Sequence, residues 1–193
     1  MKTKLIIFII IICISVSGCM GLIGRTSFVY DVTVSPVNGT AIIYVPIAID
    51  EDGSISEVMD NLTIYSYPDN VPSSNASCEI IGTIHGKALE IITDEPIRVK
   101  NKITRRGRAD RADMNITLWN KTFENGTGTG TIWMYVDSSS TAEDVTIAFE
   151  VWSVQTVLAY GDGVTITTKS HFDEVPALKT GWDARPVRKR RWG

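Results

Sequence analysis

The sequence predicts an all-β protein, an antiparallel β-sandwich for which an immunoglobulin-like arrangement is one candidate. Apolar and polar residues alternate with a period of two along most segments after residue 27, as in strands with one buried face. Asp-Gly and Asn-Gly pairs separate these segments as turns do. Because the pattern also suits a barrel, that closed form remains the alternative. The chain has 193 residues, of which 44% are hydrophobic, enough for one packed core.

The expected strands follow the alternation in chain order. In the first, Phe28 to Val34, apolar residues at even positions alternate with residues such as Asp31 and Thr33. Pro46 interrupts the second and predicts a strand edge or a bulge there. A short helical turn is expected near 170–179. The expected strands are 28–34, 41–49, 62–65, 78–84, 88–92, 97–103, 114–118, 132–136, 145–151 and 164–166.

The first nineteen residues have the order of an export signal. Lys2 and Lys4 precede an unbroken apolar run from Leu5 to Ile14, and small residues follow. The run is shorter than the roughly 20 residues that a membrane span needs. The segment Val16-Ser17-Gly18-Cys19 resembles the lipobox of prokaryotic, including archaeal, surface lipoproteins. That resemblance is confined to the leader, and it implies lipidation of Cys19 and cleavage before it. Secretion without lipid and an uncleaved anchor are the alternatives.

This interpretation divides the chain into four parts and leaves little cysteine chemistry. They are a signal peptide (1–18), a lipidated cysteine with a short tether (19–26), a β-sandwich domain (27–184) and a basic C-terminal tail (185–193). Cys13 leaves with the signal peptide and Cys19 carries the lipid, so Cys78 is the one free thiol. No intrachain disulfide is therefore expected. We interpret Cys78 as a small buried strand residue.

The chain is rich in N-glycosylation sequons. Six of its eight asparagines begin an Asn-X-Ser/Thr triplet, where chance predicts about one or two. Asn-Gly at 38–39 and 125–126 can also be explained as hairpin turns. Sequons together with a lipobox favour an archaeal surface, and we expect exposed acceptors. A bacterial source, in which most sequons would be unused, is the alternative. The predicted sites are Asn38, Asn61, Asn75, Asn115, Asn120 and Asn125.

Positive charge is concentrated in two segments, 98–111 and 185–191, although the chain as a whole carries a net charge of −3. Such segments can contact lipid headgroups, acidic glycans or an acidic partner. Solvated loops and tails are the alternative, and Arg188–Arg191 also resembles a furin-type cleavage site. We expect no nucleic-acid binding. The candidate anionic-surface residues are Arg105, Arg106, Arg108, Arg188, Lys189, Arg190 and Arg191.

The residues offer little for catalysis or metal binding. His85 and His171 are the two histidines, and neither lies in a nucleophile motif. The acidic loop 50–54 departs from calcium-loop spacing, so an Asp-Gly turn explains it better. Trp119, Trp133 and Tyr135 are candidates for an exposed aromatic strip that stacks on sugars, although ordinary packing explains them better. We expect no enzyme, no cofactor and no metal.

The function expected from the sequence is structural, adhesive or partner-binding. The protein would be a lipid-anchored, N-glycosylated component of the cell envelope on the extracytoplasmic side of the membrane. Its partners would be the membrane and envelope glycans or surface proteins, and the sequence leaves its oligomeric state open. An accessory or solute-binding lipoprotein with a ligand cleft is one alternative. A secreted hydrolase, which needs a histidine near a carboxylate and a nucleophile, is the other.

Overall fold

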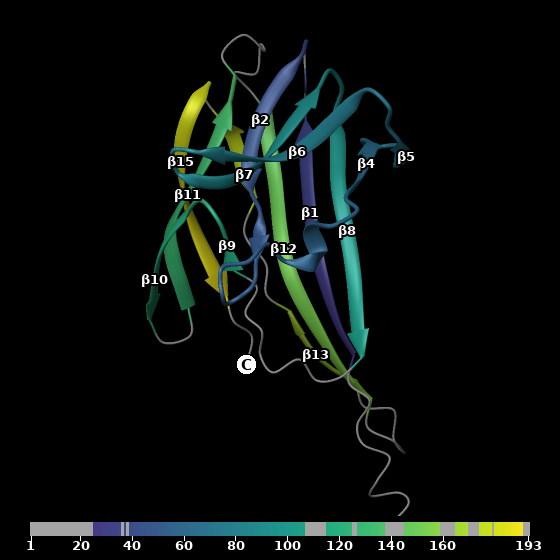
Figure 1. The fold of residues 1–193 in the computed structure, drawn as a ribbon, viewed down its shortest axis with the longest axis vertical. Helices are drawn as coiled ribbons and strands as arrows, with labels where there is room; N and C mark the ends of the chain where they lie inside the picture. The colour runs from purple at the N-terminus through teal and green to yellow at the C-terminus, as the bar shows by residue number, and fades with distance from the viewer. Residues whose placement is uncertain are drawn as a thin grey trace, which may run out of the picture.

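The structure is a computed structural model that describes residues 25–35, 37, 39–106, 115–124, 127–137, 145–158, 165–169, 174–178 and 180–190. It confirms the all-β prediction: two antiparallel sheets pack face to face as a sandwich (Figure 1). The expected signal peptide and Cys19 lie outside the described residues. Among the described residues, no helix is both long and apolar enough to cross a membrane.

The first sheet has seven strands. Its order is β13 (Thr165–Lys169), β12 (Val145–Leu158), β1 (Arg25–Ser35), β8 (Ile97–Arg106), β4 (Thr63–Ser66) and β5 (Val71–Pro72), and β14 (Val175–Leu178) also pairs with β12. Strand β1 is central, because it pairs along nearly its whole length with β12 and with β8. Side chains alternate between the two faces of a strand, and the even-numbered residues from Phe28 to Val34 lie in the core.

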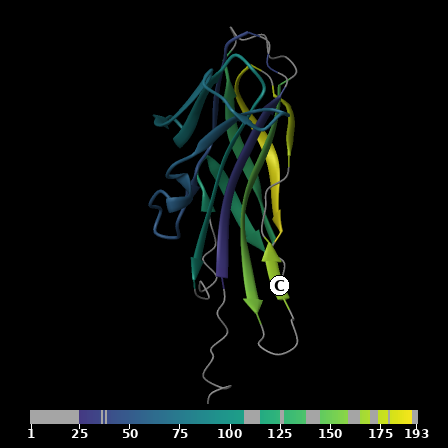
Figure 2. The ribbon, with the colours of Figure 1, turned by 90° about the vertical axis from the view of Figure 1, so that its right-hand side faces the viewer.

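The second sheet has six strands. Its order is β10 (Trp119–Glu124), β11 (Thr127–Val136), β2 (Ala41–Pro46), β7 (Gly86–Thr93) and β6 (Ala76–Thr83), and β15 (Gly181–Arg190) pairs with β11. A small sheet of β3 (Ala48–Ile49) and β9 (Asn115–Ile116) and a 3-10 turn, η1 (Glu57–Met59), complete the fold. Figure 2 looks onto the seven-stranded sheet, in which the purple β1 lies beside the lime-green β12.

The core formed by the described residues lies between the two sheets. Its buried members run from Phe28 in β1 to Val187 in β15. Tyr30 is fully buried and packs edge-on against Phe149, with ring centroids 5.7 Å apart. Its hydroxyl donates a 2.7 Å hydrogen bond to the carbonyl of Pro46. Burial raises the pKa of Tyr30 well above its usual value, so this hydroxyl stays protonated and keeps its bond.

Two expectations about the C-terminal region need correction. Residues 185–190, expected in a tail outside the sandwich, form the second half of β15, which pairs with β11 up to Arg190. Strand β15 pairs with one neighbour among the described residues, and such edge strands tolerate proline and charged residues. Within the range expected to hold a helical turn, Val175–Leu178 is strand β14, held by pairing with β12.

Candidate binding surface

The outer faces of the two sheets differ in chemistry. On the six-stranded sheet, Tyr44 of β2 lies opposite Tyr135 of β11, and Tyr135 lies opposite Trp182 of β15. Cross-strand partners share a face of a sheet, and their neighbours Ile43 and Met134 are in the core. These three rings therefore form a row on the outer face.

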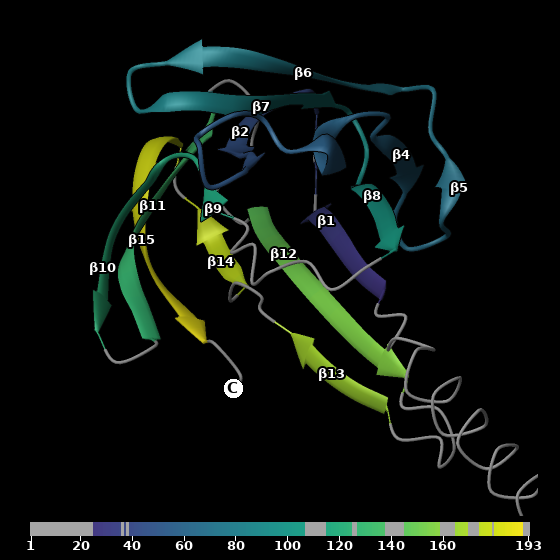
Figure 3. The same ribbon diagram turned by 60° about the horizontal axis from the view of Figure 1, so that its bottom comes forward.

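Two further rings extend this row, one from the β6–β7 hairpin and one from β11. His85, in the turn of this hairpin, stacks on Trp133 of β11 with centroids 4.2 Å apart and planes 6° apart. The same imidazole meets the ring of Trp182 at 4.7 Å and 73°. Figure 3 shows the hairpin with its turn on the side of β11 and β15. We call Tyr44, His85, Trp133, Tyr135 and Trp182 the aromatic surface; all five are partly exposed.

Aliphatic residues extend this surface toward β6. Ile42 of β2 lies opposite Ile92 of β7, which is 36% exposed, on the face that carries Tyr44. Ile84 at the tip of the β6–β7 hairpin is 85% exposed, beside His85. Contiguous exposed apolar side chains on a sheet face are typical of an interaction surface.

Glu90 adds a polar group to one side of the aromatic surface. It lies opposite Tyr44 on β7. Burial raises the pKa of Tyr44, and the nearby Glu90 carboxylate, which is hydrogen-bonded to the tyrosine, raises this pKa further. The Tyr44 hydroxyl thus stays protonated and orients the ring, which stacks on Tyr135 at 4.6 Å.

The sequence placed Trp119 with Trp133 and Tyr135, and this grouping is wrong for Trp119. Trp119 lies opposite Ile132, a core residue, and packs against the core. The reason is local backbone geometry: Leu118 has a φ of 55° and is buried, so the alternation of faces changes just before β10. The other two residues of the group do share the outer face.

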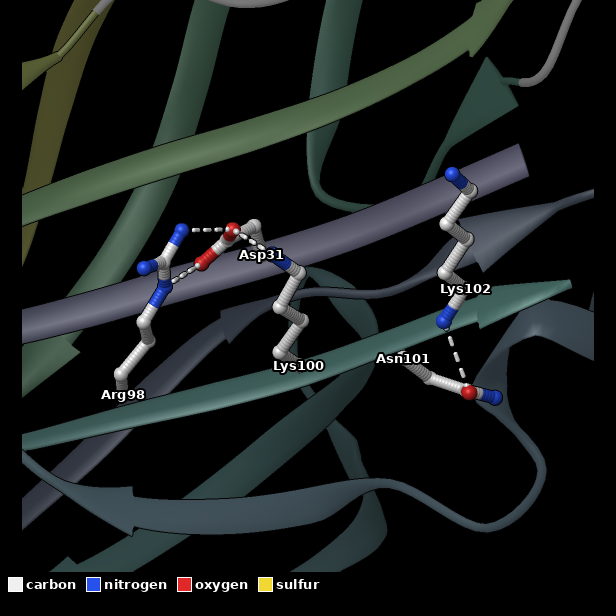
Figure 4. Close-up of polar contacts among 5 residues, drawn as sticks. All are labelled: Asp31, Arg98, Lys100, Asn101 and Lys102. Atoms are coloured by element: carbon white, nitrogen blue, oxygen red, sulfur yellow. Dashed lines mark hydrogen bonds and ion pairs between the residues drawn. The ribbon is translucent and has the colours of Figure 1, made fainter. Parts of the chain in front are cut away.

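The outer face of the seven-stranded sheet is charged instead. Asp31 of β1 is 7% exposed and accepts two hydrogen bonds from the Arg98 guanidinium, 2.8 Å from Nε and 2.5 Å from Nη2 (Figure 4). Lys100 approaches the same carboxylate at 3.6 Å. The hydrogen bonds to Asp31 raise the pKa of Arg98. Part of the first basic segment is therefore neutralised within the fold.

The anionic-surface candidates that the structure describes lie on both sheets. Arg105 of β8 pairs with Glu57 of η1, and its guanidinium lies 5.9 Å from the centroid of the Phe28 ring. Arg188 is exposed on β15, in the other sheet. Arg106, Lys189 and Arg190 lie on strands, and their side chains are outside the described part. Arg108 and Arg191 lie outside the described residues.

The sequons differ in exposure. Asn61, in a turn, Asn75, just before β6, and Asn120 on β10 are exposed. Asn115 on β9 is half-buried, opposite Ile49. Asn38 and Asn125 lie outside the described residues.

The remaining candidates are a cysteine, an acidic turn and the second histidine. Cys78 is half-buried in β6, and burial raises the pKa of its thiol. Asp52 accepts hydrogen bonds from the amide and hydroxyl of Ser54, at 2.9 Å and 2.7 Å, as expected for a turn. No group of three or more His, Cys, Asp or Glu side chains in the described part could hold a metal. His171 lies outside it.

Comparisons with known proteins give no family to which the chain could be assigned. No protein-family model matches it, and no curated protein and no solved structure matches it either.

Proposed function

We propose that this protein is a partner-binding component of the cell envelope, anchored by a lipid on Cys19 and carrying N-glycans. Its aromatic surface binds another envelope protein, and the proposal includes no catalytic step. The lipobox-like leader and the dense sequons support an archaeal envelope and the extracytoplasmic side of the membrane. The exposure of Asn61, Asn75 and Asn120 suits glycan attachment.

The row of Tyr44, Tyr135 and Trp182 is the observation that carries this proposal. Tyrosine and tryptophan supply much of the binding energy at protein interfaces, because their rings bury large apolar area with few rotatable bonds. Here the rings are already held by mutual contacts, with Tyr135 and Trp182 centroids 5.4 Å apart. Binding a partner therefore costs little ordering of these side chains.

The exposed isoleucines point to a protein partner. Ile84 at the hairpin tip and Ile92 on β7 widen the apolar area beyond the rings. In a two-layer sandwich each outer face normally meets water and carries polar residues, as the charged face around Asp31 does. An outer face rich in aromatic and aliphatic residues is then best explained by a partner that covers it.

A pair of matched double variants tests this proposal. The chain from residue 19 with Cys19→Ser is immobilised, and solubilised envelope proteins of the cells that make it are passed over it. We expect Tyr44→Ser/Trp182→Ser to weaken capture of its partner at least about tenfold, as for interface hot spots. Circular dichroism verifies that the variant is folded.

The control removes the same two residue types from the charged face. Tyr65 and Trp152 are half-buried on the seven-stranded sheet, opposite Arg98 and Val29. Tyr65→Ser/Trp152→Ser should leave capture within about twofold of the unmodified chain. Equal loss in both double variants, or no loss in either, would contradict a role for the aromatic surface.

A further inference from the structure

Basic residues gather at the end of the sandwich where β1 begins and where β8, β12 and β15 end. We call this end the N-terminal pole. Arg25, the first residue of β1, lies opposite Arg106, the last residue of β8. The last three residues of β15 are Arg188, Lys189 and Arg190. Figures 1 and 2 both show β15 running toward the end at which β1 starts.

Acidic residues are scarce at this pole and common at the other. We compare the three described residues of each strand that lie nearest the N-terminal pole. Of these residues, Glu124 at the end of β10 is acidic. Arg105 also lies there, but it already pairs with Glu57. At the opposite end, where β7 and β11 stop and β8 and β15 start, acidic residues outnumber the basic Arg98 and Arg185, of which Arg185 pairs with Asp183. The acidic residues there are Asp94, Glu95, Asp137 and Asp183. The described sandwich is thus polarised along its long axis.

The register of β1 and β8 places two basic residues, Arg25 and Arg106, opposite each other at this pole. Like charges directly opposite each other on neighbouring strands repel and destabilise the sheet. On β15, in the other sheet, three basic residues follow one another at the end of the strand. An anionic surface placed against the pole would turn each of these charges into a favourable contact.

The position of Cys19 identifies that surface. Five residues separate Cys19 from Arg25, so the two are at most about 21 Å apart when the chain between them is fully extended. We propose that the N-terminal pole rests on the anionic headgroups of the membrane that holds Cys19. The geometry rests on the lipid anchor of the proposed function. The aromatic row, near the start of β15, then lies away from the membrane and open to a partner.

Vesicle binding by the unlipidated chain tests this proposal without the anchor. The chain from residue 19 with Cys19→Ser is sedimented with neutral phosphatidylcholine vesicles and with vesicles containing about 30% phosphatidylglycerol. We expect binding to the anionic vesicles alone, and loss of most of it when salt rises from about 50 to about 300 mM. Binding to neither kind of vesicle would overturn the proposal.

Two double variants with the same change in net charge locate the contact. Each basic residue near an anionic membrane strengthens binding about fivefold, so Arg25→Ser/Arg188→Ser should lower the partition constant about 25-fold. Lys87→Ser/Lys102→Ser removes two exposed lysines away from the strand ends of the pole and should change it less than about threefold. Equal effects would overturn the assignment to the pole.

An acidic polymer distinguishes lipid from glycan. Polygalacturonate is titrated against the same chain. If it binds while phosphatidylglycerol vesicles do not, the lipid assignment is overturned and the pole belongs to an acidic glycan. Each of these outcomes is separate from the capture experiment, because the pole and the aromatic surface share no residue.

Discussion

Asp31 shows how one residue holds two strands together on a solvent-side sheet face. Its carboxylate accepts hydrogen bonds from Nε and Nη2 of Arg98, and Nζ of Lys100 lies 3.6 Å away. Both basic residues belong to the neighbouring strand β8. Its side chain is 9% exposed, whereas that of Arg98 is 32% exposed. The pair is therefore partly shielded from water, and its attraction is stronger than that of an ordinary surface pair.

Removing the charge of Asp31 should destabilise the protein measurably. In the Asp31→Asn variant, Arg98 and Lys100 lose their shared counter-ion and remain close to each other. We expect the free energy of unfolding to fall by about 2 kcal/mol, between the values for exposed and buried ion pairs. The midpoint of urea unfolding measures this change.

The control is the pair between Glu57 and Arg105, whose side chains are 53% and 55% exposed. Water screens this pair well, so Glu57→Gln should lower the stability by less than about 0.5 kcal/mol. If Asp31→Asn costs no more than Glu57→Gln, burial does not strengthen the pair on the charged face.

At the scale of elements, alternation predicts a strand's faces but not its neighbours. In β11, Ile132, Met134 and Val136 are buried and Trp133 and Tyr135 face outward, as their spacing predicts. Alternation alone does not predict the aromatic surface. Its members Tyr44, His85 and Trp182 join it through pairing between strands that are distant in sequence. Local alternation contains no signal for such pairing.

The two Asn-Gly pairs predict two hairpins, of which one is present in the structure. Asn125-Gly126 predicts a hairpin, and Glu124 does pair with Thr127 across it. Asn38-Gly39 predicts another, but β1 and β2 belong to different sheets, so the chain crosses between layers there. The basic residues of β15 predict a solvated tail from sequence, because an edge strand accepts charged side chains and has no distinctive pattern.

The β6–β7 hairpin should depend on His85 for its position on the sheet. The imidazole stacks on Trp133 and contacts Trp182, whereas Ile84 beside it is 85% exposed. In His85→Ala the tip loses both ring contacts, and we expect a loss of about 1 kcal/mol. Hydrogen exchange of the amides between Thr83 and Gly86 should become at least about fivefold faster. Ile84→Ala should leave these rates unchanged, and equal rates in both variants would show that the rings do not hold the hairpin.

At the scale of the whole molecule, the two ends and two faces of the sandwich suggest separate tasks. The charged face around Asp31 meets water, and the aromatic surface suits a partner. The N-terminal pole carries Arg25, Arg106 and the basic end of β15. Such a division is useful only if one end of the molecule is fixed, so the hypothesis depends most on Cys19.

Substituting Cys19 therefore tests the organisation of the molecule as a whole. Without the thiol no lipid can be attached, so Cys19→Ser should leave the membrane fraction or accumulate as an uncut precursor. Membrane fractionation and intact mass distinguish these results. Cys78→Ser is the matched control, because this half-buried residue of β6 lies within the sandwich. Its fractionation and processing should not change. If Cys19→Ser also behaves like the unmodified chain, the anchor is not at Cys19, and the basic pole must be explained by a partner other than the membrane beneath it.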